Sequence, residues 1–334
     1  MLELEYDSVI IGAGLAGLTA AFRLKSKTLV VSKSLGATAI STGTITYDKE
    51  RDLEAEKWFI DTMRGSCCEY ITGKCVTDMG KECHGMIQES TAYPDNATII
   101  SLNGLIDKNK TGFKQDVVDI RYLPGRSYQE ISGILENDQE SLKELGLILS
   151  GIKGNSLALP PMLGCRNAGK IRERLEAATG KEIYEYTSAP SVMGLRLIEG
   201  LREKLAGSKN VDIMDMARIE RVTDGTIYGH IGTKARREIT IAADRVVLAT
   251  GGLLTGFAIS EDRLIEPLTG TIVSDSVDLD FNEEFLSDHP IMNKGIGSAP
   301  KIRGFKKVTA AGAVSSGYGL YNALVTGYHA GDSL

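Results

Sequence analysis

A glycine-rich turn close to the beginning of the chain restricts the possible folds more than any other feature. Gly12, Gly14 and Gly17 stand in the spacing G-x-G-x-x-G, between an apolar run at Tyr6–Ile11 and a helical pattern at Leu15–Lys25. In such a turn the first glycine permits a tight bend, the second lets the backbone approach a diphosphate, and the third lets the helix pack closely on the strand. The pattern predicts a strand–turn–helix unit that binds a dinucleotide. A glycine-rich packing turn without a ligand is the alternative.

Further apolar runs predict a sheet around this unit. Thr28–Ser32 completes a β–α–β pattern, which is typical of the start of a parallel sheet. From residue 211 onward, short alternating runs separated by turn residues predict a β-meander. The later strands are expected at Val211–Met214, Arg218–Val222, Thr226–Ile231, Glu238–Ile241, Arg245–Ala249 and Val308–Val314, and a final helix at Leu320–Ala330.

The middle of the chain contains two similar passages. Helices are expected there at Glu50–Arg64 and Tyr128–Leu145, and strands at Thr98–Leu102 and Val117–Leu123. At an offset of 30 residues, two further helical patterns each follow a proline and a glycine and begin near an arginine, Arg166 or Arg196. Two amphipathic helices entered in the same way are one interpretation, and a paired anion clamp is the other.

The composition excludes several protein classes. The 334 residues include 38 Lys and Arg and 44 Asp and Glu, a net charge of −6, which argues against a general nucleic-acid binder. The five cysteines are an odd number, so we expect a reducing compartment rather than a disulfide framework. The apolar stretch Ser8–Phe22 follows acidic residues and is short for a membrane span, so we expect neither a signal peptide nor a transmembrane segment. These features predict a cytoplasmic protein.

The end of the second predicted strand departs from the usual dinucleotide pattern. An acidic residue commonly stands there and binds a ribose hydroxyl. Here the positions are Ser32 and Lys33. Ser32 has a hydroxyl for one hydrogen bond to a ribose, and Lys33 has a charge suited to an adenylate phosphate. A solvated surface lysine is the alternative for Lys33.

Three glycine-rich segments far apart in the sequence favour a flavin over a nicotinamide cofactor. They are the loop at residues 36–44, the ATGG sequence at Ala249–Gly252, and the turn before the final helix. A flavin dinucleotide needs such contacts because its ring system lies far from its adenine. The final helix begins near Gly317–Leu320, and its positive end suits the negative charge of a reduced flavin ring. Three unrelated turns are the alternative. The expected cofactor contacts are Gly12, Gly14, Leu15, Ala16, Gly17, Ser32, Lys33, Thr38, Ser41, Thr42, Gly43, Ala217, Thr250, Gly251, Gly312, Ala313, Gly319 and Leu320.

These segments carry a family resemblance. The glycine turn together with Ala249–Gly252 resembles the two-domain flavoproteins of the fumarate reductase and succinate dehydrogenase type. A closer resemblance, to the B-type subunit of anaerobic glycerol-3-phosphate dehydrogenase, extends in order over most of the chain. It is carried by SVIIGAGLAGLTAAFRL at 8–24, STGTITYD at 41–48, APSVMGLRL at 189–197, LATGG at 248–252, EPLTG at 266–270, and AAGAVSSGY at 310–318 with ALVTGYHAG after it.

The resemblance implies an α/β fold with a discontinuous main domain. We expect a Rossmann-like FAD-binding domain of the glutathione reductase type, with a parallel sheet and a β-meander, and an inserted smaller α+β cap or substrate region. The FAD-binding domain is expected from residues 1–50, 190–255 and 300–334, and the cap from residues 51–189 and 256–299.

The resemblance also implies a function. Proteins of this type are oxidoreductase subunits that work beside a catalytic flavoprotein subunit and an iron–sulfur subunit and pass electrons toward a membrane quinone pool. FMN is often assigned to this subunit, but a diphosphate-binding turn favours FAD. A small-molecule substrate such as glycerol 3-phosphate is expected, with membrane contact only through a partner. The alternatives are a stand-alone fumarate reductase-like enzyme acting on a small carboxylate, and a non-catalytic flavin-binding relay or scaffold subunit.

The catalytic candidates are His289 and Arg196. His289 lies in a Ser-Asp-His-Pro sequence and suits a general base, and Arg196 suits a contact to a phosphate or carboxylate. A surface histidine and a helix-surface arginine are the alternatives. Two positions depart from related flavoproteins: Met193 stands where a proline is common, and Ala313 stands where many flavoproteins have an aspartate that holds the ribityl chain.

A group of cysteines between residues 67 and 84 raises the question of a metal. The residues are Cys67, Cys68, Cys75 and Cys83, with His84 after the last. Their spacing matches no common zinc or iron–sulfur pattern, so we expect no metal site and interpret them as packed or surface thiols. A cluster that faces a partner is the alternative.

Overall fold

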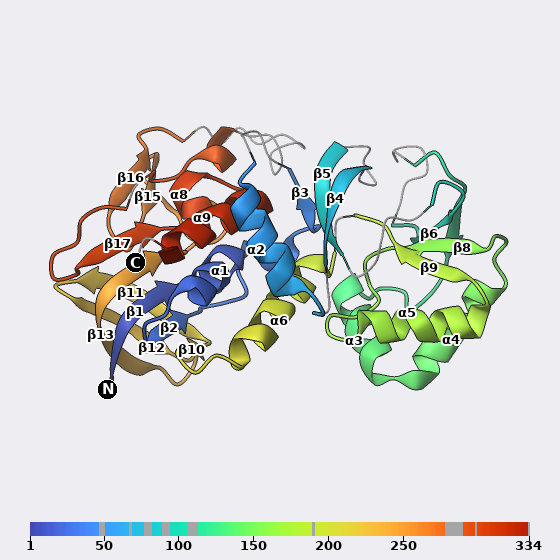
Figure 1. Ribbon diagram of the computed structural model, residues 1–334, viewed down its shortest axis with the longest axis horizontal. Helices are drawn as coiled ribbons and strands as arrows, with labels where there is room; N and C mark the ends of the chain where they lie inside the picture. The colour runs from blue at the N-terminus through green and yellow to red at the C-terminus, as the bar shows by residue number, and fades with distance from the viewer. Residues whose placement is uncertain are drawn as a thin grey trace. The chain divides into compact units, whose positions relative to one another are not determined.

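The chain forms two compact units. The computed structural model describes residues 1–46, 51–66, 69–76, 82–88, 94–105, 113–188, 191–277, 290–297 and 299–332, with only the backbone described in 69–76 and 82–88 (Figure 1). The first unit consists of Met1–Thr38, Lys49–Lys57 and Leu201–Leu334. The second unit consists of Ala39–Asp48 and Trp58–Gly200. The chain is mixed α/β with parallel sheets in both units, which confirms the predicted fold class.

A seven-stranded sheet forms the first unit. Its strands are β1 (Leu2–Ile11), β2 (Thr28–Val31), β10 (Val211–Met214), β11 (Ala217–Thr223), β12 (Thr226–Ile231), β13 (Arg237–Leu248) and β17 (Lys307–Ala310). The order is β10-β2-β1-β13-β12-β11, and β17 also pairs with β13. β10, β2, β1, β13 and β17 run parallel, whereas β12 is antiparallel to both β11 and β13. A parallel sheet and a meander are thus joined in one sheet.

β13 is the strand that joins these two parts. Its first half pairs with β12 and its last residues pair with β17, while β1 pairs along nearly its whole length. The sequence predicted two separate strands here, Glu238–Ile241 and Arg245–Ala249. That expectation was wrong, because the ten-residue β1 holds the intervening residues extended, from Ile239 to Leu248.

Helices α1 (Leu15–Arg23) and α9 (Leu320–Asp332) pack against each other through glycine. A Cβ atom at Gly327 would lie 2.4 Å from the carbonyl oxygen of Ala16, and one at Gly331 would lie 2.3 Å from Arg23 Cβ. These two glycines, one turn apart on α9, let the helix backbones approach closely. The contact ties the end of the chain to its beginning.

The remaining elements of the first unit are short. β14 (Ala258–Ser260), β15 (Arg263–Glu266) and β16 (Thr271–Ser274) form a small antiparallel sheet, and η2 (Pro290–Asn293) and α8 (Ala313–Ser316) are single turns. The strand predicted to extend to Val314 ends at Ala310. It stops because Gly312 turns the backbone at a φ of 76° and α8 begins directly after it.

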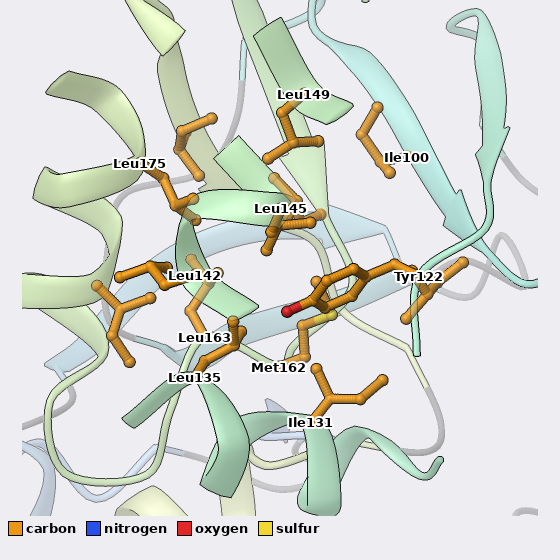
Figure 2. Packing of buried hydrophobic residues seen from close by; sticks show 14 of the residues in the cluster. Ile100, Tyr122, Ile131, Leu135, Leu142, Leu145, Leu149, Met162, Leu163 and Leu175 are labelled. Carbon is orange, nitrogen blue, oxygen red and sulfur yellow. The ribbon is translucent and has the colours of Figure 1, made fainter. Parts of the chain in front are cut away.

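The second unit has its own four-stranded parallel sheet. The order is β7 (Val117–Ile120), β6 (Thr98–Leu102), β8 (Ser156–Leu159) and β9 (Glu182–Glu185). Helices α3 (Tyr128–Asn137), α4 (Gln139–Ser150) and α5 (Ala168–Thr179) share a buried core with it. Figure 2 shows Leu145, Leu149 and Leu175 meeting in this core, with the Tyr122 ring directed toward it.

The other elements of this unit are a small sheet and parts of three helical segments, each of which contains a boundary between the units. β3 (Thr44–Ile45), β5 (Glu82–Gln88) and β4 (Glu69–Val76) form an antiparallel sheet with β5 in the centre. The short η1 (Ala37–Ile40), α2 (Leu53–Met63) and α6 (Met193–Ala206) each contain a point at which the chain passes from one unit to the other.

One predicted helix is two helices in the structure. The region expected as a single helix at Tyr128–Leu145 divides at Asp138. The Asp138 N–H donates to Ile134 O and ends α3, and its side chain accepts from the Glu140 N–H and begins α4. Aspartate favours this position because its carboxylate accepts from the free amides of a first helical turn.

The unit boundaries differ from the predicted domain boundaries. Residues 191–200, predicted for the FAD-binding domain, fall in the second unit. The described residues of 256–299, predicted for the cap, fall in the first unit. Which residues cover a bound cofactor stays a prediction.

The glycine contact between α1 and α9 predicts that alanine substitutions at two helical glycines change stability in opposite directions. Gly327→Ala should lower the melting temperature, because overpacking of this kind costs about 1–3 kcal/mol. Gly133→Ala in α3 is the matched control, since among the described residues outside α3 no atom would lie within 4 Å of its new Cβ. The control should raise stability by about 0.5–1 kcal/mol. Thermal unfolding of both variants checks this; equal stability of the two would contradict the described packing.

Candidate cofactor site

Four parallel strands of the first unit end side by side, and the glycine-rich turns follow them. β2, β1, β13 and β17 are neighbours in that order, so their carboxyl ends form one edge of the sheet. Ligands of open α/β sheets bind in the crevice outside this edge. Backbone hydrogen bonds link the residues after the strands to the neighbouring strands: Gly12 N–H to Val31 O at 2.8 Å, Ala249 N–H to Ile11 O at 2.9 Å, and Ala311 N–H to Leu248 O at 2.9 Å.

The three glycines of the first turn have different surroundings. Gly12 has a φ of 120°, and a Cβ there would lie 2.1 Å from Ala249 O. A Cβ at Gly17 would lie 1.9 Å from Gly12 O. Gly14 has an ordinary φ of −78°, and among the described residues the nearest atom to its Cβ would be Thr38 Oγ1, at 3.1 Å. The fold itself requires Gly12 and Gly17, whereas a side chain at Gly14 would press on the Thr38 hydroxyl alone among the described residues.

The first turn of α1 has backbone amides that suit an anion. The Leu15 N–H donates to Thr38 Oγ1 at 3.0 Å, and the Leu18 N–H donates to Gly14 O at 3.0 Å. The amides of Ala16 and Gly17 lie too early in the helix to find an acceptor within it. Together with the positive end of the helix dipole, they form a site that suits a diphosphate.

The backbone around Ser32 is fixed by the neighbouring strands. The Ser32 N–H donates to Met214 O at 2.8 Å, and the Ala217 N–H donates to Ser32 O at 2.9 Å. The Ser32 hydroxyl donates to Ser34 O at 2.7 Å, so only the lone pairs of its oxygen remain for a ribose hydroxyl. The side chain of Ser32 is buried, and that of Lys33 is exposed.

The turn after β13 contains a buried polar atom without a partner. Within the part of the chain that the structure describes, Thr250 Oγ1 is buried and has no hydrogen-bond partner. Gly251, with a φ of 89°, continues the turn, and Gly252 O accepts from three amides that follow it. Buried hydroxyls are nearly always hydrogen-bonded. A polar ligand at this edge would satisfy Thr250.

The turn after β17 touches both other turns. A Cβ at Gly312 would lie 2.8 Å from Ala16 Cβ, and a Cβ at Gly252 would lie 3.0 Å from Ala313 Cβ. The Gly312 N–H donates to Thr326 Oγ1 of α9 at 2.7 Å. The turns after β1, β13 and β17 therefore meet at one place, whereas most of the predicted loop at residues 36–44 belongs to the second unit.

The start of α9 is anchored by a polar network. Gly319 has a φ of 136° and leads into Leu320, the first residue of α9. The Tyr321 hydroxyl donates to Glu56 Oε1 at 3.0 Å and accepts from the Asp52 N–H at 2.6 Å. Burial raises the pKa of Tyr321 to about 12, and the hydrogen bond to Glu56 adds to that rise, so the hydroxyl stays protonated at neutral pH. The network fixes the end of α9 that was predicted to face the flavin ring.

Three predicted contacts belong to the second unit. Ser41, Thr42 and Gly43 form a small turn in which the Gly43 N–H donates to Ser41 Oγ at 3.1 Å and the Thr42 and Thr44 hydroxyls lie 2.9 Å apart. Their contact with the cofactor stays a prediction.

Arg196 is fully buried, and its guanidinium group is paired with a carboxylate of the same chain. Its Nη1 donates to Glu185 Oε2 at 2.5 Å, its Nη2 donates to Glu185 Oε1 at 2.9 Å, and its Nε donates to Gly164 O. Arg166 pairs separately with Glu199 at 2.7 Å. The anion expected for Arg196 is therefore Glu185, and we do not propose a substrate role for this arginine. No sequence pattern singled out Glu185.

The remaining candidates are placed as follows. His289, Cys67 and Cys68 lie outside the described residues. His230 Nδ1 lies 3.1 Å from Glu220 Oε1 between β12 and β11. In the described ranges no group of three or more His, Cys, Asp or Glu residues could hold a metal ion.

Comparison with known proteins identifies the kind of domain. The family model described as FAD binding domain matches residues 7–275. A curated relative, the B-type subunit of anaerobic glycerol-3-phosphate dehydrogenase from Pectobacterium atrosepticum, is 27% identical over 209 residues, which are 60% of this chain and 48% of the relative. The chain therefore spans about half the length of this relative. FAD, the predicted cofactor, is confirmed by the family match, and the buried Thr250 hydroxyl without a partner fits such a ligand.

Among the solved structures that match this chain are two whose matches extend over nearly its whole length. p-Nitrophenol 4-monooxygenase from Pseudomonas putida DLL-E4 is 12% identical with a TM-score of 0.43, over 100% of this chain and 80% of that one. The Mycobacterium smegmatis Sdh1 complex in the apo form is 14% identical with a TM-score of 0.34, over 99% of this chain and 68% of that one.

The position of Gly14 at the start of α1 predicts a selective loss of cofactor binding when a side chain is added there. Gly14→Val keeps an allowed backbone conformation but places a branched side chain where the diphosphate should lie. We expect at least about a tenfold weaker affinity for FAD, because one charge-assisted hydrogen bond contributes about 1.5 kcal/mol or more. Titration of the apoprotein with FAD measures this, with Gly133→Ala as the control. Unchanged affinity in a folded Gly14→Val variant would contradict this position for the diphosphate.

The buried pair of Arg196 and Glu185 predicts a large loss of stability when the arginine alone is replaced, and a partial recovery when both residues are replaced. Arg196→Ala should destabilise the second unit by about 3–5 kcal/mol, because it leaves a buried carboxylate without its partner. The double variant Glu185→Gln/Arg196→Met removes both charges and should recover much of the loss, since the glutamine's amide oxygen still accepts the Met162 and Leu163 amides that Glu185 Oε1 accepts. Urea unfolding compares the two. A double variant no more stable than Arg196→Ala would contradict the pairing.

Proposed function

Because the chain belongs to the FAD binding domain family, we propose that it is a flavin-bearing oxidoreductase subunit of the type found in anaerobic, quinone-linked glycerol-3-phosphate dehydrogenase. The observation that carries the proposal is the meeting of three glycine-rich turns at one sheet edge, beside the free amides of α1. The curated relative that bears this name supports the choice among flavoproteins.

In this proposal, different residues of the first unit contact different parts of FAD. The amides of Ala16 and Gly17 bind the diphosphate, and the fixed backbone near Ser32 receives the ribose. The Thr250 hydroxyl gains a partner from the ligand. Bound FAD supplies reversible hydride and electron transfer at its N5 atom. The positive end of α9, held by the Tyr321 and Glu56 contact, would favour negative charge on a ring bound beside it.

The proposal includes partners. In a complex of this type, electrons pass between the flavin and a catalytic flavoprotein subunit and an iron–sulfur subunit, with glycerol 3-phosphate as the donor. We place the protein in the cytoplasm, with membrane contact through the partners. None of the helices in the described parts of the chain has the length and apolar character that a membrane crossing needs. Residues 51–189 and 256–299 would form the cap over the flavin.

A second candidate is a subunit that relays electrons without binding the substrate itself. The observation in its favour is the state of the two predicted anion-binding arginines: Arg196 is occupied by Glu185, and Arg166 pairs with Glu199. A stand-alone fumarate reductase-like enzyme needs at least two arginines and a histidine at the ring, so this pairing disfavours it.

Anaerobic reduction of the bound flavin separates these functions. The chain is loaded with FAD and mixed with glycerol 3-phosphate, alone and together with its partner subunits, and the absorbance of the oxidised flavin is followed. A chain that itself takes the hydride from glycerol 3-phosphate predicts bleaching by the substrate alone, and the relay function predicts bleaching of this chain's flavin only when the partners are present. Gly14→Val in the complex is the control that should lose the signal of this flavin. No bleaching under either condition would reject both.

A further inference from the structure

The hairpin of β4 and β5 brings two of the clustered cysteines together. Cys75 and Cys83 are partners across the antiparallel ladder, and Val76 pairs with Glu82 beside them. An irregularity between Thr72 and Cys75 shifts the register just before this pair. Without that shift Cys75 would have a different partner, so the register itself places the two cysteines opposite each other.

The spacing of such a pair suits a disulfide. Residues directly opposite each other in an antiparallel ladder have Cα atoms about 4.5–5.5 Å apart. A disulfide spans Cα separations of about 4.4–6.8 Å. The Cα separation typical of such a pair therefore lies within the range that a disulfide spans.

The sheet around the pair holds the register in place. β5 is the central strand, with β4 on one side and β3 on the other. Gly85, two residues after Cys83, pairs with Thr72 on one side and with Ile45 on the other. β5 is thus fixed by pairing with β3 on one edge and with β4 on the other. This pairing opposes a change in the register of β4 relative to β5.

We propose that Cys75 and Cys83 form a reversible disulfide, so that the β4–β5 hairpin is a redox modification site. Two thiols lose two protons and two electrons, and one S–S bond forms. A low-molecular-weight disulfide, with oxidised glutathione as the probe, accepts the electrons and is cleaved to two thiols. The exchange passes through a mixed disulfide on one cysteine, which the other then displaces. In a reducing compartment such a bond is transient, as a regulatory bond must be.

Peptide mapping tests the pairing directly. The FAD-loaded full chain is incubated with oxidised glutathione, free thiols are alkylated, and the protein is digested with trypsin without reduction. Cleavage after Lys and Arg separates Cys75 (residues 75–81) from Cys83 (residues 82–108), and both from the peptide of Cys67 and Cys68 (residues 65–74). We expect peptides 75–81 and 82–108 to be joined by a bond that dithiothreitol releases.

Cys165 provides the internal control. It lies in the second unit near Ser132 Oγ at 3.5 Å, and burial raises the pKa of its thiol, so it should react more slowly with glutathione and with the alkylating reagent than an exposed cysteine. Cys165→Ser should leave the joined peptides unchanged, and Cys75→Ser should abolish them. The proposal is overturned if Cys75 and Cys83 remain separately alkylated, if each retains glutathione alone, or if peptide 65–74 is the bonded partner. The mapping of the unaltered protein decides the question without any variant.

Discussion

The close approach of the first glycine turn to the residue after β13 is the contact on which the first unit depends. A side chain at Gly12 would overlap Ala249 O, and one at Gly17 would overlap Gly12 O. The ends of β1 and β13 meet because neither glycine has a side chain. That meeting also brings the turn after β17 against α1, through Gly312 and Ala16. The proposed cofactor site is therefore a consequence of how neighbouring parallel strands end.

The first unit contains both the start of α1, whose amides suit an anion, and the anchored start of α9. Thr38 is the last residue of the first unit before the chain enters the second unit. Its hydroxyl accepts a hydrogen bond from the Leu15 N–H, the first amide of α1. The chain then returns at residues 51–57, where Glu56 and Asp52 hold Tyr321. The segments just before and just after residues 39–48 thus hold the start of α1 and the start of α9.

Much of the first unit could be predicted from the sequence, because its signals are local. The glycine spacing, the apolar runs and the ATGG sequence lie directly on the turns that meet in the structure. The break at Asp138 could also have been predicted, since aspartate is a favoured helix cap. The continuous β13 could not, because its extension through Ala243 depends on pairing with β1, more than two hundred residues away in the chain.

The partner of the Arg196 guanidinium also could not be predicted from the sequence. A guanidinium suits a carboxylate of a substrate and a carboxylate of its own chain in the same way. Only the packing of the second unit decides between them, by placing Glu185 at the end of β9 against the buried guanidinium. The register that pairs Cys75 with Cys83 likewise depends on an irregularity in β4 that no sequence pattern predicted.

A density map of the FAD-loaded protein tests the central claim most directly. The account predicts the diphosphate against the amides of Ala16 and Gly17, with the face of Gly14 covered and the Thr250 hydroxyl hydrogen-bonded to the ligand. A flavin bound elsewhere, or side chains that fill this sheet edge in fully loaded material, would contradict it.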